Sequence, residues 1–445
     1  MAHDDYTSKF GSRADFGTDN SGPNDSITDE ALCTLEADPG KDQFALHRRP
    51  RVVIGHPRLG RGGSESVVMW LIEALKHDFD VTVMTTGGWN LSALNAYYGT
   101  QVGEDEVKVR IAPVPFPMHR FNASALRGAC YQRFASRIAR EYDVRVSAYN
   151  TTDWGQPGIH FLADFSWNHE IRDHLDPPSP GLIYRDSLMR RAYLAIAAAY
   201  ERPSRRDVLR GDVIIANSRW SATLLKQDCG VECAAVIYPP VWSDFPNVPW
   251  DSKELAFAMI GRIAPEKQIE KAIAILEIVR RRGHAMRLHL CGHIGNDLYG
   301  RRIARLCELR KYWITTEGQV GGSKKAHILA HCRFGIQTRC AEPFGISVAE
   351  MVKAGAIVFA PNNGGQTEIL DSPDLLFGGI DEAADKICAV LDNAEKQCAL
   401  RNHLAQRAKM FSAERFMETS VAVIASSFAH KTHIGRNNAD HHALA

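Results

Sequence analysis

The chain has 445 residues, which is long for a single hydrophobic core and favours two domains with additional tails. Its composition, with 45% hydrophobic and 24% charged residues, is that of an ordinary globular protein and excludes the collagen-like and disulfide-scaffold classes. The net charge of +1 argues against nucleic acid as a partner, because binding a phosphate backbone requires a strongly basic face.

The first 49 residues are predicted to form a disordered tail, since their polar residues are scattered and lack the apolar segment of a signal peptide. No uninterrupted apolar stretch approaches the ~20 residues that a membrane-spanning helix requires. The longest candidate, residues 188–200, is interrupted by Arg190 and Arg191. Ten cysteines without a Cys-x-x-Cys pair indicate reduced thiols and a cytoplasmic location.

Residues 50–242 are predicted to form a Rossmann-like domain. An apolar run at 51–55 leads into a glycine-rich turn and then into a helical pattern at 67–75, which is the opening of a doubly wound α/β unit. A helix is predicted at 125–142. Further strands are predicted at 81–84, 107–111, 144–148, 159–163 and 213–216.

A second Rossmann-like domain is predicted over residues 243–411, after prolines at 239, 240, 246 and 249 that mark a hinge. Its helix at 266–282 has apolar residues at helical spacing and ends at Gly283. The other predicted elements are strands at 256–260, 287–291, 314–317 and 334–338 and a helix at 300–310. We expect a last helix at 412–428 to return to the first domain, and residues 429–445 to be unstructured.

The strongest chemical signal lies at residues 339–350, after the strand at 334–338 and at the start of a helix that closes at Gly355. Unpaired N–H groups at a helix start attract anions, so Phe344, Gly345 and Ile346 are predicted to bind a diphosphate. Glu342 and Glu350 are expected to bracket it, one reaching sugar hydroxyls and the other ribose hydroxyls. The alternative is a helix start that carries acidic residues only for the helix dipole.

This segment resembles the signature of family 4 glycosyltransferases, in which two glutamates are separated by seven residues in a Glu-x-Phe-Gly-aliphatic setting. Residues 261–267 look like the family's Gly-Arg…Lys segment, which implies that Arg262 and Lys267 neutralise the diphosphate of the donor. Fixed cations there would stabilise the charge that develops on the leaving phosphate. Without the resemblance, both residues would read as exposed charges at a helix start.

Two glycine pairs extend the resemblance. Gly364 and Gly365 lie in a loop similar to the one that closes over the donor sugar in the family, and Gly62 and Gly63 resemble the pair that faces the donor phosphate across the cleft. Ordinary turns between strands and helices are the alternative for both. The first pair in the chain departs from Gly-x-Gly-x-x-Gly, which counts against a dinucleotide fingerprint.

The chain departs from the family at Ala163, where retaining members usually carry a histidine. His160 and Asp164 flank this position and, with Glu342, are the candidate catalytic residues, because alternate residues of a strand point to the same side. A structural role for His160 is the alternative, and the departure leaves open a protein without activity. Asp78-Phe79-Asp80 formally matches a metal-binding motif of another transferase fold, but its place between a helix and a strand favours a solvated loop.

The resemblance implies an α/β chain of the GT-B type, with two tandem Rossmann-like doubly wound domains facing a cleft and the acceptor on the side of the first domain. It also implies retaining transfer of a hexose, of mannose or glucose type, from a GDP- or UDP-sugar to a saccharide or lipid-linked acceptor, with no metal and no other cofactor. The details look closest to the Alg-type mannosyltransferase branch, which suggests GDP-mannose.

Three alternatives remain at this point. The same scaffold supports sugar-nucleotide epimerases and hydrolases, and a non-catalytic sugar-nucleotide-binding protein belongs to a different class. A peripheral membrane contact is a further hypothesis, because arginines gather near the apolar residues 194–196, although a solvated helix face is the commoner explanation for such a pattern. The sequence assigns no oligomeric state.

Overall fold

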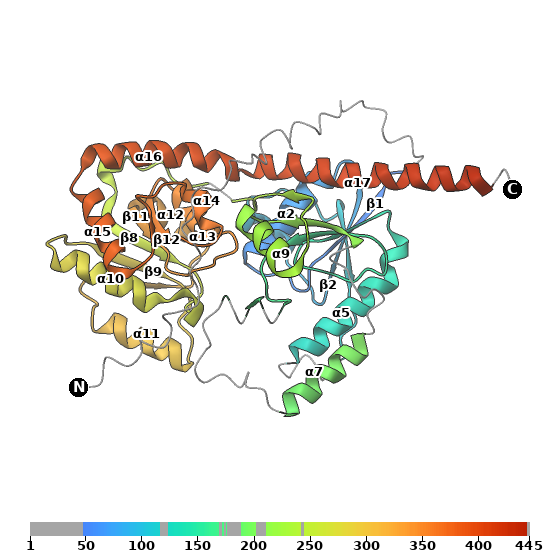
Figure 1. Ribbon diagram of the computed structural model, residues 1–445, viewed down its shortest axis with the longest axis horizontal. Helices are drawn as coiled ribbons and strands as arrows, with labels where there is room; N and C mark the ends of the chain where they lie inside the picture. The colour runs from blue at the N-terminus through green and yellow to red at the C-terminus, as the bar shows by residue number, and fades with distance from the viewer. Residues whose placement is uncertain are drawn as a thin grey trace. The chain divides into compact units, whose positions relative to one another are not determined.

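The computed structural model describes residues 48–115, 123–168, 171–172, 175, 188–201, 211–241 and 244–442. Within these ranges the chain forms two α/β domains, each built on a parallel sheet flanked by helices (Figure 1). Their buried side chains form separate hydrophobic cores. The fold is therefore α/β with two Rossmann-like domains, as the sequence predicts.

The sheet of the first domain has the strand order β3-β2-β1-β4-β5-β6-β7 in the described residues, and its neighbouring strands pair in parallel. Its strands are β1 (Arg51–Gly55), β2 (Asp80–Thr85), β3 (Val107–Ile111), β4 (Val144–Ser147), β5 (Ile159–Leu162), β6 (Val213–Ala216) and β7 (Ala235–Val236). Its helices are α2 (Gly63–Leu75), α3 (Leu91–Tyr98), α5 (Ser124–Ile138), α7 (Leu188–Glu201) and α9 (Arg219–Cys229).

The sheet of the second domain has the order β10-β9-β8-β11-β12-β13, again parallel throughout the part that the structure describes. Its strands are β8 (Glu254–Ile260), β9 (Arg287–Cys291), β10 (Ile314–Gly318), β11 (Cys332–Ile336), β12 (Ile357–Pro361) and β13 (Leu376–Phe377). Its helices are α10 (Ile269–Arg281), α11 (Leu298–Glu308), α12 (Gly322–His331), α13 (Ile346–Lys353), α14 (Gln366–Leu370), α15 (Ile380–Leu391) and α16 (Ala394–Ala408).

Each sheet has one point where the strand order reverses, between β1 and β4 in the first domain and between β8 and β11 in the second. In open α/β sheets, ligands bind in the crevice beyond the carboxyl ends of the strands at such a point. The glycine turn at 60–63 follows β1, and the segments beginning at Gly261 and Gln337 follow β8 and β11. The topology therefore places the sequence motifs where a ligand would bind.

Helix α10 shows why several elements were predictable. Its buried face contains the apolar residues expected from their spacing, Ile269, Ala272, Ile273, Leu276 and Val279. The helix ends before Gly283, whose φ of +106° lies in the region that glycine favours. Hydrophobic periodicity and a terminating glycine together determine this element, and the prediction is confirmed.

The last helix, α17 (Ala413–His442), follows the second domain but packs against α2 of the first (Figure 1). Phe416 and Ile424 are buried in the core of the first domain, and the Phe416 ring lies 6.1 Å from that of Phe161. The helix continues past the expected end at residue 428 as far as His442, and residues 443–445 of the expected tail lie outside the described part of the chain. Extending a formed helix is easier than starting one, since each added residue brings its own hydrogen bond.

None of the helices in the described part of the chain, α17 included, is long and apolar enough to cross a bilayer.

Candidate functional site

A cavity of about 1020 Å³ is lined by residues of both domains. It brings together residues that are far apart in sequence, and its walls come from the carboxyl ends of both sheets. Of the candidate residues it includes Gly62, Gly63, Asp164, Arg262, Lys267, Glu342, Phe344, Gly345, Ile346 and Glu350. His160, Gly364 and Gly365 do not belong to this lining.

The turn between β11 and α13 forms one wall of the cavity. Ala341 has a φ of +54°, which is uncommon for a residue with a side chain, and Gly345 has a φ of +104° directly before the helix. These two backbone reversals place Glu342 and Phe344 ahead of the first turn of α13. The first N–H groups of a helix lack partners within the helix, so an anion in the cavity would meet the positive end of α13.

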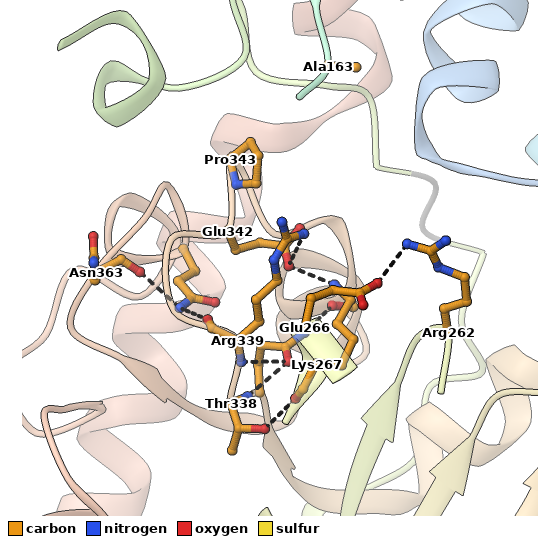
Figure 2. A network of polar contacts seen from close by, with 12 residues as sticks. Ala163, Arg262, Glu266, Lys267, Thr338, Arg339, Glu342, Pro343 and Asn363 are labelled. Carbon is orange, nitrogen blue, oxygen red and sulfur yellow. Dashed lines mark hydrogen bonds and ion pairs between the residues drawn. The ribbon is translucent and has the colours of Figure 1, made fainter. Parts of the chain in front are cut away.

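Glu342 is the centre of a charged cluster in the cavity wall (Figure 2). Its carboxylate lies 2.7 Å from Lys267 Nζ and 3.5 Å from Arg339 Nη1, and only 14% of its side chain is exposed. Burial would raise the pKa of Glu342, but Lys267 and Arg339 outweigh this effect and hold the pKa below its usual value. Glu342 is therefore ionised at neutral pH and can accept hydrogen bonds from hydroxyl groups.

Lys267 reaches Glu342 because its backbone is tied to the end of strand β11. The Thr338 hydroxyl donates to the carbonyl of Lys267 at 2.8 Å and to that of Gln268 at 2.9 Å. Figure 2 shows the hydroxyl beneath Lys267, with the lysine side chain directed at Glu342. The short turn after β8 and the end of β11 thus form one rigid corner of the site.

Arg262 lies at the same edge of the cavity but is far more accessible than Lys267. Its side chain is 79% exposed and donates to Glu266 Oε1 at 2.7 Å (Figure 2). An exposed ion pair contributes little to stability, so this guanidinium can turn toward an anionic ligand at low cost. The cavity lining thus includes one largely buried and one exposed cation.

Glu350, on the second turn of α13, is held by a lysine that the sequence patterns did not indicate. Lys325 Nζ lies 2.6 Å from Glu350 Oε1, and the same ammonium lies 5.4 Å from the centre of the Tyr97 ring. Burial disfavours the charge of Lys325, but the nearby Glu350 raises its pKa above the ordinary value. Arg339 and Lys325 were both missed. Arg339 stands three residues before Glu342, whereas only the fold brings α12 beside α13.

Gly63 stands where α2 of the first domain meets α13 of the second. A Cβ atom at Gly63 would overlap the Ile346 side chain at the start of α13. The Gly62 N–H donates to Tyr98 Oη at 2.8 Å, which fixes the turn that leads into α2. Two helix N-termini therefore approach each other across the cavity, and a bound anion would relieve the repulsion between their positive ends.

Gly364 and Gly365 lie behind the Glu342 turn rather than in the cavity lining. The Gly365 N–H donates to the Glu342 carbonyl at 2.8 Å, and a Cβ at Gly364 would lie 2.6 Å from the backbone nitrogen and oxygen of Glu342. Their small size allows the two loops to pack backbone against backbone. In this structure the pair supports the Glu342 turn, and neither glycine lines the cavity.

Replacing Gly365 with alanine tests this packing. The backbone conformation of Gly365, with a φ of −61°, is one that alanine adopts without strain. The added Cβ, however, would collide with the Pro343 carbonyl and lie 2.8 Å from Phe344 Cα and 2.9 Å from Ser218 Cβ. We expect a loss of about 1 to 3 kcal/mol in the free energy of unfolding, measured by urea denaturation. Gly88→Ala is the control, because no atom lies within 4 Å of its Cβ position. Equal stability of the two variants would contradict the packing argument.

His160 does not line the cavity, so the structure does not bring this catalytic candidate to the other candidate site residues. Its side chain is fully buried, and Nε2 lies 2.8 Å from Asp212 Oδ2. The Thr152 N–H approaches Nδ1 at 3.3 Å. Strand β5 ends at Leu162, so the alternation that would align His160 with Asp164 does not continue that far. These contacts favour the alternative, a structural role for His160 within the sheet.

Asp164 does line the cavity, beside Ala163. The Asn150 amide donates to Asp164 Oδ1 at 2.8 Å, and the Tyr149 hydroxyl lies 3.3 Å from Oδ2. The Ala163 carbonyl accepts from Asn217 at 2.8 Å, so the backbone at this position is also fixed. Asp164 is therefore a positioned carboxylate on the first-domain wall. Asp80, of the Asp78-Phe79-Asp80 sequence, instead pairs with Lys108 at 2.7 Å and lies outside the lining.

Residues 241–410 match the family described as glycosyl transferases group 1. The segment coincides with the second domain and carries Arg262, Lys267, Glu342 and Glu350. The matched segment does not include the first domain, which contributes Gly62, Gly63 and Asp164 to the cavity lining. The family match therefore covers the half of the molecule that holds these four residues.

Curated relatives are about a quarter identical to the chain over the aligned segment. The GDP-Man:Man(3)GlcNAc(2)-PP-Dol alpha-1,2-mannosyltransferase of Mus musculus is 25% identical over 228 residues, which are 46% of this chain and 46% of the relative. The Homo sapiens protein of the same name is 24% identical over 241 residues, 49% of each chain. The matched segment thus spans about half the length of these relatives.

Solved structures establish the fold. HepE of Anabaena in complex with UDP-glucose superimposes with a TM-score of 0.62 at 16% identity, covering 85% of this chain and 100% of that chain. Sucrose-phosphate synthase of Thermosynechococcus elongatus gives a TM-score of 0.62 at 16% identity, covering 86% and 100%. The chain has the GT-B fold, with two Rossmann-like domains of parallel sheet.

Proposed function

We propose that the protein is a glycosyltransferase that moves a hexose from a nucleoside-diphosphate sugar to an acceptor hydroxyl with retention of configuration. The observation that carries the proposal is the cavity in which Glu342, Glu350, Lys267 and Arg262 surround the start of α13. The group 1 match over residues 241–410 supports it. Because the curated relatives are named as acting on GDP-Man, we propose GDP-mannose as the first donor to test and UDP-hexoses as the second.

The donor diphosphate would lie against the first N–H groups of α13, with Lys267 and Arg262 beside it. As the bond between the anomeric carbon and the β-phosphate oxygen breaks, negative charge grows on the leaving phosphate, and fixed cations stabilise that charge more than they stabilise the intact donor. The acceptor oxygen then bonds to the same face of the anomeric carbon, and its proton passes to the departing phosphate. Glu342 would accept hydrogen bonds from the sugar, and Glu350 from the ribose.

No metal is required in this proposal, because the positive charge comes from the protein. Among the described residues no group of three or more His, Cys, Asp and Glu is arranged to hold a metal ion. Two lysines, an arginine beside Glu342 and a helix start already face the cavity. Turnover is therefore expected to persist in excess EDTA, and a full loss that is restored by Mg²⁺ or Mn²⁺ would contradict this part of the proposal.

A panel of GDP-, UDP- and ADP-hexoses tests the function. Each donor is incubated with simple saccharides and with a short-chain lipid diphosphate saccharide, and NMR records the anomeric configuration of the product. We expect transfer from one nucleotide class with retention. Release of sugar to water alone would favour a hydrolase, and a C2-epimerised sugar would favour an epimerase. Tight donor binding without any product would favour a binding protein. Ala163 leaves this outcome open, because retaining members of the family usually carry a histidine at that position.

The proposal places the enzyme in the cytoplasm with a peripheral membrane contact through α7. Met189 and Ile196 on this helix are 85% and 61% exposed. The neighbouring segment, which comprises α5 and the turn after it, carries three exposed arginines, Arg133, Arg137 and Arg140. An exposed apolar stripe beside arginines is the pattern of an interfacial helix.

Sedimentation with vesicles of phosphatidylcholine and phosphatidylglycerol tests this contact at low salt. We expect the protein to pellet and the double variant Met189→Glu/Ile196→Glu to remain in the supernatant. Leu298→Glu is the control, because Leu298 is 68% exposed on α11 of the other domain. Wild-type protein that stays in the supernatant would contradict the proposed membrane contact.

A further inference from the structure

Helix α9 of the first domain begins against loops of the second domain. Its cap residue, Ser218, accepts a hydrogen bond from the Ser221 N–H and donates to the Pro343 carbonyl at 2.6 Å. The Ser221 hydroxyl donates to the same carbonyl at 3.1 Å, and Trp220 Nε1 donates to Asn363 Oδ1 at 3.1 Å. Both loops carry site motifs, since Pro343 follows Glu342 and Asn363 precedes the glycine pair.

The carboxylate of Glu368 completes this junction. It accepts from the backbone N–H groups of Trp220 at 2.7 Å and Arg219 at 3.0 Å, and from the Tyr238 hydroxyl at 2.9 Å. The first turn of α9 contains no acidic residue of its own. A carboxylate at a helix start satisfies unpaired N–H groups and the positive end of the helix dipole, and here it is supplied by the other domain.

Glu368 is also linked to the Glu342 turn. It lies three residues after Gly365, whose N–H is bonded to the Glu342 carbonyl, and the short helix α14 joins the two positions. The Gln366 amide donates to the carbonyls of Arg339 and Asn363, each at 3.0 Å. Tyr238, in the segment that connects the domains, packs its ring 5.8 Å from that of Phe344. A shift of α9 would therefore be transmitted to the turn that presents Glu342.

We propose that Glu368 is a positioning residue that fastens α9 to the Glu342 turn and so keeps the cavity closed between the two domains. This inference rests on the proposed function for its effect on turnover, but not for its effect on the junction. When the fastening is lost, the donor still binds the second domain, while the first-domain wall no longer excludes water from the anomeric carbon. Turnover falls, and more of the donor is lost to hydrolysis.

Hydrogen exchange tests the junction directly. In Glu368→Ala, exchange of the amides at Arg219 and Trp220 is expected to rise at least about 10-fold, because each loses a hydrogen bond to a charged group. The control is Glu382→Ala, which also removes a carboxylate bonded to a backbone N–H, that of Gly378 at 2.7 Å, but within a single domain. The control should leave exchange at α9 unchanged. Wild-type exchange rates at these two amides in Glu368→Ala would overturn the proposal.

Binding and turnover separate a positioning role from a donor-binding role. The dissociation constants of GDP and UDP, titrated separately by calorimetry, should stay within about twofold in Glu368→Ala, as expected for sites without direct interaction. Transfer should fall about 10- to 100-fold, with a higher ratio of hydrolysis to transfer. Glu368→Gln, which keeps the size and one acceptor oxygen, should lie between the two proteins. A nucleotide affinity that falls as far as turnover would overturn the proposal.

The outcome distinguishes this inference from the proposed function. If wild-type protein transfers no sugar from any donor, the proposed function fails, while the exchange experiment still decides whether Glu368 holds α9. If transfer is normal in Glu368→Ala and the hydrolysis ratio is unchanged, the positioning role fails and the glycosyltransferase proposal stands.

Discussion

Glu342→Gln is expected to lower kcat about 100- to 1000-fold, which is the range seen when one preorganised hydrogen-bonding group is removed from a transition state. The substitution keeps the size of the side chain but removes the charge that Lys267 and Arg339 now balance. Glutamine would also present an amide N–H group toward these two cations. The measurement is the initial rate of nucleoside diphosphate release with a saturating donor and acceptor.

The matched control for this variant is Glu277→Gln. Glu277 also accepts from an arginine, Arg310, at 2.5 Å, but it lies outside the cavity lining. We expect wild-type kcat for this variant. If Glu342→Gln retained the wild-type rate as well, the carboxylate would have no part in the reaction, and the central assignment of the site would be lost.

Lys267→Ala is expected to have the second large effect, through two separate routes. It removes the buried cation beside the start of α13, so affinity for GDP or UDP should fall, and kcat/KM should fall about 100-fold as the leaving phosphate loses its partner. It also removes the stronger of the two cations that hold down the pKa of Glu342. With only Arg339 left to oppose the effect of burial, the pKa of Glu342 rises from its wild-type value.

The sign of the pH effect follows from this shift. In the wild type the depressed pKa keeps Glu342 ionised down to acidic pH, whereas in Lys267→Ala protonation sets in at higher pH. If activity requires the carboxylate, the acid limb of the kcat/KM profile should move to higher pH in the variant. Lys396→Ala, which breaks the Lys396–Asp374 pair at 2.7 Å away from the cavity, should leave the profile unchanged. An unshifted acid limb in Lys267→Ala would show that Lys267 does not control Glu342.

The regular elements were predictable because their signals are local. Strands β3, β6 and β9 have the bounds that their apolar runs indicate, and α10 follows its three-and-four spacing. The Glu342 and Glu350 spacing could also be interpreted directly, because both carboxylates belong to one turn and the helix that follows it. Local periodicity was thus sufficient to predict the elements of both domains, and motif spacing was sufficient to predict the candidate residues of the second domain.

The remaining contacts depend on distances along the chain that no local pattern reports. Asp212 meets His160 across 52 residues, and Lys325 meets Glu350 because α12 packs beside α13. Alternation along β5 suggested that His160 faces the cavity, but the strand is too short for that rule to reach Asp164. Burial and partner choice in such cases are properties of the assembled sheet, and they became visible only with the fold.

Helix α17 has a consequence for how the molecule is made. The core of the first domain is completed by Phe416, Val423 and Ile424, which stand near the other end of the chain. During synthesis on the ribosome, residues 244–411 emerge before these three residues do. The second domain can therefore form its core while the apolar surface along α2 of the first domain is still exposed. A gene fragment that stops at the connection between the domains would leave that surface open, and any attempt to express the first domain alone must carry the final helix with it.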